Sequence, residues 1–404
     1  MGRAIAEWVL ASGIDVCLVD HNADSITTPI ACDVPNAFNA VYRQVDADCA
    51  KPDDFRGNPP SNQAPPNRTA DIAGRHSPND CLSIDQGMLP EWCQRWIQHD
   101  PLARFRFCSP AATGDDAMKA FHAAPSIVLE SIVERLPAKQ SAITVLENVF
   151  DRDCLLASNT STLPIHSIAA KMRHPDRLMG MHFFMPVSQR DAVEIIPHAG
   201  TTNTIVQRAT AFVWQIKKSP LIVRDAAGFV VNRLLAPYLN AAMRLLCRGQ
   251  TNAAIGSAAR AFGMPLSPFQ LVDIIGLRTA FDGGAVYFAN YGGGKRPSPL
   301  LAGLLRRQRR SESRISLLDD GGNLSTSAID CVLEYRDEDR AEIPVTQQQL
   351  TQLLFVPMYR EALAILEAGV VNDREDINAA LRGGLGFHGD FWARNWQNCV
   401  DKAE

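Results

Sequence analysis

Short apolar runs that end in polar residues recur along the middle of the chain and predict the strands of an open α/β sheet. The runs cover residues 155–157, 177–184 and 192–196. A run of this length between polar or turn residues is typical of a buried strand. A helical pattern over residues 204–218 is followed by a short strand and then by a longer helical region from residue 225 to 246. The pattern therefore predicts a sheet followed by helices.

The first 20 residues predict an amphipathic helix, a stop at Gly13 and a strand that ends at Asp20. This order is typical of the second half of a dinucleotide-binding βαβ unit, in which an acid after the second strand binds the adenosine ribose. Met1 and Gly2 match the last two positions of the G-x-G-x-x-G fingerprint, and nothing in the sequence matches the strand and the glycines that come before. We therefore expect cofactor contacts from Met1, Gly2 and Asp20 in a fold whose first strand is missing.

Residues 27–124 do not follow this pattern. Residues 51–80 contain six prolines among many polar residues, a composition that favours a flexible, irregular insert. The strand pattern returns at residues 125–134 and ends in Glu134, and Lys139 follows at the start of the next helix.

Composition and charge narrow the class of protein. Hydrophobic residues make up 46% and charged residues 21% of the 404 residues, which is typical of an ordinary globular protein with room for two or more domains. The net charge of −4 argues against a general nucleic-acid binder. No apolar run approaches the roughly 18 residues of a membrane span and no signal peptide is evident, so we expect a cytoplasmic protein without membrane insertion. The ten cysteines lack the spacing of a zinc site, and we expect no metal.

Three residues with catalytic potential follow or interrupt the apolar runs. Ser161 lies in the polar cluster after residues 155–157, His182 lies inside the second run and Glu194 interrupts the third. Because an unpaired buried carboxylate is costly, we expect Glu194 to pair with His182 and to orient the ring as a general base. Each residue alone also fits a structural role, as a core histidine, a strand-edge carboxylate or a helix cap. Their combination favours chemistry.

These motifs resemble those of the 3-hydroxyacyl-CoA dehydrogenase family, the nicotinamide-dependent enzymes of fatty acid β-oxidation. The matching segments are SNTST from Ser158, GMHFF from Gly180, VE at 193–194, DAAGFVVNRLLAPYLNAAMRLL from Asp225 and FGMPLSPFQLVD from Phe262. The likeness covers most of the chain outside residues 27–124. It implies an α/β Rossmann-like NAD-binding domain, here without its first strand, followed by two related all-α C-terminal domains.

The resemblance also implies a reaction and roles for individual residues. The reaction is oxidation of an (S)-3-hydroxyacyl-CoA to a 3-oxoacyl-CoA with NAD, and His182 would be the general base with Glu194 as its partner. Ser161 and Asn232 would bind the reacting oxygen of the substrate. The residues implied to contact the cofactor on its nicotinamide side are Ile132, Val133, Glu134, Lys139 and Ser161. The family further suggests an acyl-CoA substrate and either a homo-oligomer or a partner in a β-oxidation complex.

The C-terminal third contains an internal duplication. The segment APYLNAAMRLLCRG from Ala236 is echoed by VPMYREALAILEAG from Val356, and a glycine-phenylalanine turn follows each copy. We therefore predict an NAD-binding domain over residues 1–224 with an irregular insert at about 27–124, and helical domains over 225–320 and 343–404.

Two departures from the family pattern leave alternatives open. Met185 stands where the family usually has asparagine, and the first strand has no counterpart. A catalytically impaired remnant or scaffold subunit of the same fold is therefore a second hypothesis. A related hydroxy-acid dehydrogenase that uses a lysine, for which Lys171 is the nearest candidate, is a third.

Overall fold

The computed structural model describes residues 1–12, 16–19, 105–108, 126–294, 296–311, 314–336, 345–393 and 396. The chain divides into two compact units, Met1–Pro125 and Ser126–Glu404. Asp20 lies outside the described residues, as does the predicted insert apart from residues 105–108.

The first unit contains the helix and the strand that the N-terminal pattern predicts. Helix α1 (Gly2–Ala11) is followed by strand β1 (Val16–Val19), which pairs in parallel with β2 (Phe105–Cys108). In α1 the side chains of Ile5, Ala6 and Val9 are buried, at the three- and four-residue spacing of an amphipathic helix.

The second unit begins with a five-stranded sheet in the order β3-β4-β5-β6-β7. The strands are β3 (Ile127–Glu130), β4 (Leu155–Ser158), β5 (Leu178–Phe183), β6 (Ala192–Pro197) and β7 (Ser219–Ile222). Neighbouring strands are parallel except for β5 and β6, which are antiparallel. Every residue of β4 and β5 is buried, as expected for central strands that are covered on both faces. The strands predicted from the apolar runs are confirmed.

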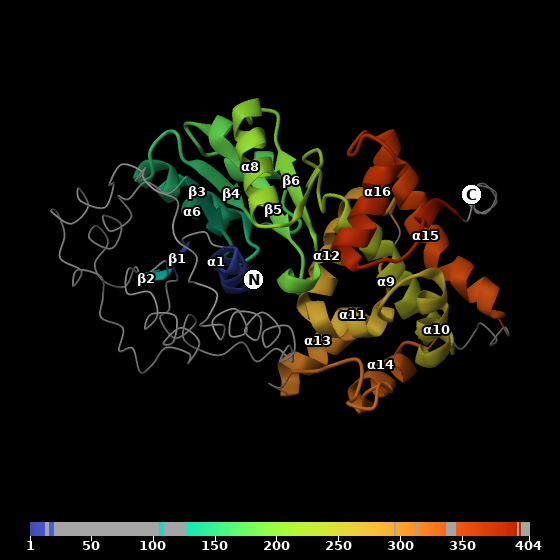
Figure 1. Ribbon diagram of the computed structural model, residues 1–404. Helices are drawn as coiled ribbons and strands as arrows, with labels where there is room; N and C mark the ends of the chain where they lie inside the picture. The colour runs from blue at the N-terminus through green and yellow to red at the C-terminus, as the bar shows by residue number, and fades with distance from the viewer. Residues whose placement is uncertain are drawn as a thin grey trace, which may run out of the picture. The chain divides into compact units, whose positions relative to one another are not determined.

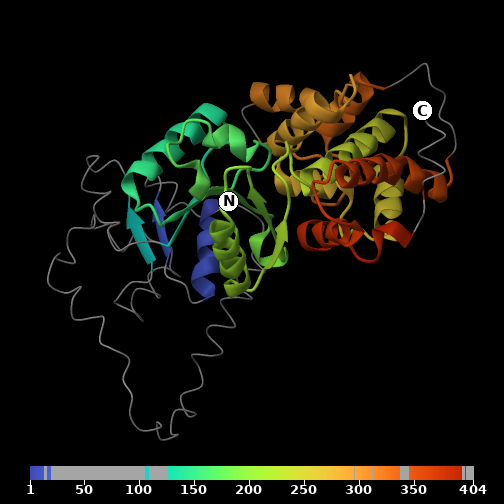
Figure 2. The same cartoon turned by 90° about the horizontal axis from the view of Figure 1, so that it is seen from above.

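Three helices cover the sheet, α6 (Leu136–Val149), α7 (Ile165–Ala169) and α8 (Asn203–Gln215). Helix α6 packs on β3 and β4, α7 packs on β5, and α8 packs on β5, β6 and β7. Figure 2 shows α6 and α7 on one side of the sheet and α8 on the other. Short 3₁₀ turns, η2 (Pro175–Arg177) and η3 (Val187–Gln189), precede and follow β5.

Strand β3 ends earlier than the sequence pattern predicts. The apolar run was expected to continue to Glu134, but the last paired residue is Glu130. The Glu130 carboxylate accepts a hydrogen bond of 2.6 Å from the backbone N–H of Ile132, which turns the chain out of the sheet. Glu134 therefore lies in a loop, and Lys139 lies in the first turns of α6 as predicted.

The rest of the second unit is helical, with α9 and α15 at its centre (Figure 1). The elements are α9 (Val231–Cys247), α10 (Asn252–Phe262), α11 (Pro268–Ile275), α12 (Leu277–Tyr291), α13 (Leu300–Ser311), α14 (Thr326–Glu334), α15 (Gln347–Glu367), α16 (Arg374–Ala380), the π-helical turn η4 (Leu381–Leu385) and the 3₁₀ turn η5 (Phe391–Ala393). Among the described helices, none has the length and apolar character needed to cross a membrane.

The two copies of the predicted repeat form similar helices that pack against each other. Helix α9 has Pro237 in its interior and α15 has Pro357 at the matching place. Across their contact Tyr238 and Phe355 stack with ring centroids 5.1 Å apart. The turns after the copies also meet, because Phe262 and Phe387 lie 5.5 Å apart. The copies therefore share one aromatic core, and the domain boundaries proposed above stay predictions.

Candidate active site

The antiparallel pairing of β5 and β6 places His182 directly opposite Glu194. Opposed residues of an antiparallel pair carry their side chains on the same face of the sheet, so the two groups can meet. Nδ1 of His182 lies 2.7 Å from Oε2 of Glu194. His182 is 4% exposed and Glu194 is fully buried. The predicted pairing of the two side chains is confirmed.

Glu194 is also held by the start of helix α9. Its other oxygen, Oε1, accepts hydrogen bonds of 3.0 Å from the backbone N–H groups of Val230 and Val231. The first N–H groups of a helix have no partner within the helix and carry partial positive charge, so they suit a carboxylate. Both oxygens of this buried acid therefore have hydrogen-bond partners, and the sequence pattern gave no indication of the two backbone donors.

A left-handed turn points these backbone donors at Glu194. Gly228 has φ 73° and Phe229 has φ 50°, so the helix predicted from residue 225 begins only at Val231. A left-handed conformation is easy for glycine but costs a bulky residue on the order of 1–3 kcal/mol. Phe229 is fully buried, and its ring centroid lies 6.0 Å from that of His182. The strained turn thus packs beside the imidazole and also sets the start of α9.

The structure joins Ser161 and Asn232 through the backbone. Nδ2 of Asn232 donates to the carbonyl oxygen of Ser161 at 2.8 Å, while the Ser161 hydroxyl lies 3.2 Å from Oε1 of Glu134. Asn232 directly follows Val231, one of the two backbone donors to Glu194. The first turn of α9 therefore connects the histidine–glutamate pair to the loop after β4.

Further hydrogen bonds join the loop after β4 to the segment before α9. The Asp225 carboxylate accepts from the backbone N–H groups of Ile165 and His166 at 2.7 and 2.8 Å. The N–H of Gly228 donates to the carbonyl oxygen of Thr162 at 3.1 Å. Together with the Asn232 bond, these contacts fix the two segments side by side.

A buried charge network lies at the carboxyl ends of β3 and β4. Nζ of Lys139 lies 2.9 Å from Glu130 and 3.4 Å from Glu134, and the Ser158 hydroxyl donates to Glu130 at 2.5 Å. Lys139 is 1% exposed, so its ammonium group is shielded from solvent and forms ion pairs with these two carboxylates. Glu130 and Ser158 were not singled out from the sequence, although an acid at the end of an apolar run was a usable signal.

Glu134 organises the loop that contains Ser161. Its Oε1 accepts from the hydroxyl of Thr160 at 2.7 Å and from the backbone N–H groups of Ser161 and Thr162, both at 2.9 Å. Burial opposes ionisation of Glu134, but the charge of Lys139 and these hydrogen bonds outweigh burial and lower its pKa. Glu134 is therefore ionised at neutral pH and ties the loop after β3 to the loop after β4.

A second buried ion pair holds the first turn of α9 from the other side. Arg233 and Glu361 of α15 are 3% and 5% exposed, and Nε of Arg233 donates to Oε1 of Glu361 at 2.7 Å. The hydroxyl of Tyr287 donates to Oε2 at 3.0 Å, and the guanidinium lies 3.9 Å from the ring centroid of Tyr291. Burial raises the pKa of Glu361 in spite of the opposing charge of Arg233.

The buried Lys218 fixes the loop that leaves β5. Its ammonium donates to the carbonyl oxygens of Val187 and Arg190 at 2.6 and 2.7 Å. Burial lowers the pKa of Lys218 from 10.5 to about 8, although the charge of Asp191 opposes the shift. The loop begins after the strand of His182 and contains Met185, the position where the family pattern has asparagine.

The low pKa of Lys218 predicts a pH-dependent contribution to stability. Between about pH 8 and 10.5 the unfolded chain keeps the proton that the folded chain has released, so stability rises with pH in that window and the cost of burial is greatest below it. The free energy of unfolding of the wild type, relative to Lys218→Met, should increase by roughly 3 kcal/mol across the window. Urea unfolding of both proteins near the two limits measures this; a constant or falling difference would contradict the assignment.

Lys171, the residue proposed for a hydroxy-acid dehydrogenase without coenzyme A, is exposed just after the end of α7. By contrast, His182 and Glu194 lie inside the sheet and are hydrogen-bonded to each other. Among the described residues, no group of three or more His, Cys, Asp or Glu side chains could hold a metal ion.

A largely parallel open sheet followed by helices is the architecture of many dinucleotide-binding enzymes. Comparison with protein families narrows this class. The family model described as 3-hydroxyacyl-CoA dehydrogenase, NAD binding domain, matches residues 108–226, and the model of the C-terminal domain matches residues 228–315. Together they match just over half of the chain. The chain belongs to the 3-hydroxyacyl-CoA dehydrogenase family and is an NAD-dependent oxidoreductase.

Solved structures share this fold. The 3-hydroxybutyryl-CoA dehydrogenase of Escherichia coli is 20% identical to this chain with a TM-score of 0.62. The alignment covers 99% of this chain and 89% of the E. coli chain. The dehydrogenase part of multifunctional enzyme 1 of C. elegans is 20% identical with a TM-score of 0.55, covering 100% of this chain and 81% of its own. The (S)-3-hydroxybutyryl-CoA dehydrogenase of Ralstonia eutropha is 24% identical with a TM-score of 0.54, covering 78% of this chain and 93% of its own.

Two exposed apolar side chains lie in the loop after β3, where the NAD contacts are predicted. Ile132 and Val133 are 45% and 61% exposed in this loop. Neighbouring exposed apolar side chains often mark a surface that a ligand covers. A flat cofactor ring would cover them, since dinucleotides bind outside the carboxyl ends of the strands in open α/β sheets. Met1 is 43% exposed at the start of α1. The cofactor contacts predicted for Met1, Gly2, Ile132, Val133, Glu134, Lys139 and Ser161 stay predictions.

Proposed function

We propose that this chain oxidises (S)-3-hydroxyacyl-CoA to 3-oxoacyl-CoA in fatty acid β-oxidation, with His182 as the general base. The observation that carries the proposal is the 2.7 Å contact between Nδ1 of His182 and Glu194. NAD, when bound, accepts the hydride from C3 of the substrate. The protein supplies the base, its orientation and the hydrogen bonds to the reacting oxygen.

The proposed mechanism assigns one tautomer to His182. An ionised carboxylate has no hydrogen to donate, so in this mechanism Nδ1 of His182 carries the ring hydrogen and donates it to Oε2 of Glu194. The lone pair then resides on Nε2, which has no hydrogen-bond partner among the described residues. Nε2 can therefore take the proton from the 3-hydroxyl, and Glu194 stabilises the imidazolium that forms.

Asn232 would bind the reacting oxygen. One hydrogen of its Nδ2 is donated to the Ser161 carbonyl oxygen at 2.8 Å, and the second is left for the substrate. Ser161 can donate to the same oxygen only if its hydroxyl turns away from Glu134, which accepts it at 3.2 Å. A preorganised donor of this kind stabilises charge that grows on the oxygen during hydride transfer.

Removal of the Asn232 amide is expected to affect turnover more than substrate binding. Asn232→Ala should lower kcat by about 10² with a small change in KM, because the bond to oxygen strengthens in the transition state. Asn240→Ala is a matched control, since Asn240 also lies on α9 and bonds a backbone group, the N–H of Ser298, at 2.7 Å. Steady-state kinetics should show equal losses for both variants if Asn232 only supports the helix.

The substrate class has its own test. The purified chain should oxidise NADH in the presence of acetoacetyl-CoA and should be far slower with free acetoacetate, which lacks coenzyme A. Equal rates with the two ketones would favour a hydroxy-acid dehydrogenase. Absence of turnover with either ketone would favour the impaired remnant or scaffold subunit.

A further inference from the structure

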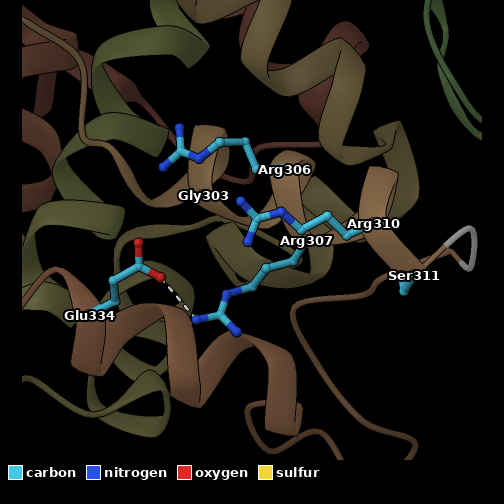
Figure 3. A pocket seen from close by; sticks show the side chains of 6 residues that line it. All are labelled: Gly303, Arg306, Arg307, Arg310, Ser311 and Glu334. Carbon is cyan, nitrogen blue, oxygen red and sulfur yellow. Dashed lines mark hydrogen bonds and ion pairs between the residues drawn. The ribbon is translucent and has the colours of Figure 1, made fainter.

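A basic pocket lies in the helical region, away from every residue given a role above. It has a volume of about 400 Å³ and is lined by Gly303, Arg306, Arg307, Arg310, Ser311 and Glu334. Five of these residues lie on α13, and Glu334 is the last residue of α14. Figure 3 shows the arginine side chains extending from α13, with Arg307 reaching Glu334.

The positive charge of the basic pocket is only partly neutralised. Arg307 pairs with Glu334 at 2.9 Å and lies 3.8 Å from Asp330. Arg306 bonds to the hydroxyl of Tyr335, which is a neutral group. Arg310 is exposed and has no hydrogen bond or ion pair with any described residue. Two guanidinium groups therefore line the cavity without a carboxylate partner in the part of the chain that the structure describes.

The spacing of Arg306 and Arg310 adds electrostatic repulsion to this excess of positive charge. Arg306 and Arg310 are four residues apart on one helix, where like charges are neighbours and repel each other. The C-terminal end of α13 favours basic residues through its dipole, which accounts for charge in the last turn. It does not account for three guanidinium groups around one cavity, and a bound anion would relieve the repulsion between them.

We propose that the basic pocket binds a phosphate-bearing small molecule, with Arg306 and Arg310 as its principal ligands. A guanidinium group presents paired donors that match two phosphate oxygens. The volume falls in the usual range for small-molecule sites, roughly 300–1,000 Å³, so it admits more than a single phosphate group. Glu334 does not prevent binding, because Arg307 already neutralises it. This binding function goes beyond the oxidation proposed above, which uses none of these residues.

Calorimetric titration of the full chain with inorganic pyrophosphate at low salt tests the site directly. One saturable site is expected, and Arg306→Gln or Arg310→Gln should each weaken binding at least about tenfold, since a hydrogen bond to a charged group contributes roughly 1.5–3 kcal/mol. Arg309→Gln is the matched control, because Arg309 belongs to the same run and is exposed but does not line the pocket. All three arginines are exposed, so the variants should fold normally.

Two results would overturn the proposal. One is a titration in which pyrophosphate fails to saturate a site. The other is a weakening of binding by Arg309→Gln as large as that in the pocket variants, which would indicate general surface charge.

The KM for acetoacetyl-CoA distinguishes the two possible sources of the phosphate. A raised KM for acetoacetyl-CoA in the pocket variants alone would identify the nucleotide end of coenzyme A, whereas an unchanged KM would identify a separate phosphorylated metabolite. Because the titration needs no turnover, its failure is distinguishable from failure of the proposed oxidation.

Discussion

Glu194→Gln is expected to lower the rate of 3-hydroxyacyl-CoA oxidation by about 10² to 10⁴ while leaving KM nearly unchanged. The backbone N–H groups of Val230 and Val231 both donate to Oε1 of Glu194. In the variant they would hold the amide oxygen of glutamine, so its NH₂ group would face Nδ1 of His182. Nδ1 must then accept, the ring hydrogen moves to Nε2, and the base loses its free lone pair.

The control for this variant is another buried glutamate with two backbone donors. Glu147 is 7% exposed and accepts from the N–H groups of Arg173 and His174 at 3.0 and 2.6 Å. Glu147→Gln should reduce stability slightly and leave kcat unchanged. Glu147 accepts only from backbone N–H groups, so it orients no histidine ring. Steady-state kinetics and thermal unfolding of both variants distinguish the roles; equal kcat values for Glu194→Gln and the wild type would exclude the tautomer argument.

Glu361→Leu is expected to cost about 3–5 kcal/mol of unfolding free energy, since it leaves the Arg233 guanidinium buried without its counter-charge. Arg233 is 3% exposed, and the ring of Tyr291 would be its main remaining partner. The double variant Arg233→Met/Glu361→Leu should recover most of the loss, because two apolar side chains remove the uncompensated charge. Urea unfolding of the two variants beside the wild type measures both effects.

An exposed ion pair on the same part of the protein provides the comparison. Arg278 and Asp282 lie four residues apart on α12 with side chains 60% and 41% exposed. Asp282→Ala should change stability by less than about 0.5 kcal/mol. If Glu361→Leu were as mild as this surface change, the Arg233–Glu361 pair could not hold the start of α9 in place.

The sequence predicts the strands and the histidine–glutamate pair for one shared reason. Fully buried strands need continuous apolar runs, so polar residues inside them stand out. His182 and Glu194 stand out in this way, and their partnership follows from the cost of burying an acid alone. The same signal explains why the strands of both residues appear in the structure close to where the pattern placed them.

Contacts between distant segments could not be predicted in this way. The donors to Glu194 are backbone N–H groups of Val230 and Val231, which have no side-chain signature. The Arg233–Glu361 pair joins residues 128 positions apart, and either charge alone is typical of a solvated helix face. The early end of β3 depends on one side-chain bond from Glu130 to the backbone, and a local apolar pattern contains no such information.

The most direct test of the central claim is the rate of NADH oxidation by the full chain with acetoacetyl-CoA, measured beside His182→Gln. The wild type should turn over, and His182→Gln should be slower by about 10² to 10⁴, the usual contribution of a general acid–base group. Equal turnover by the two proteins would show that His182 does not carry the proton, and the proposed mechanism would be wrong.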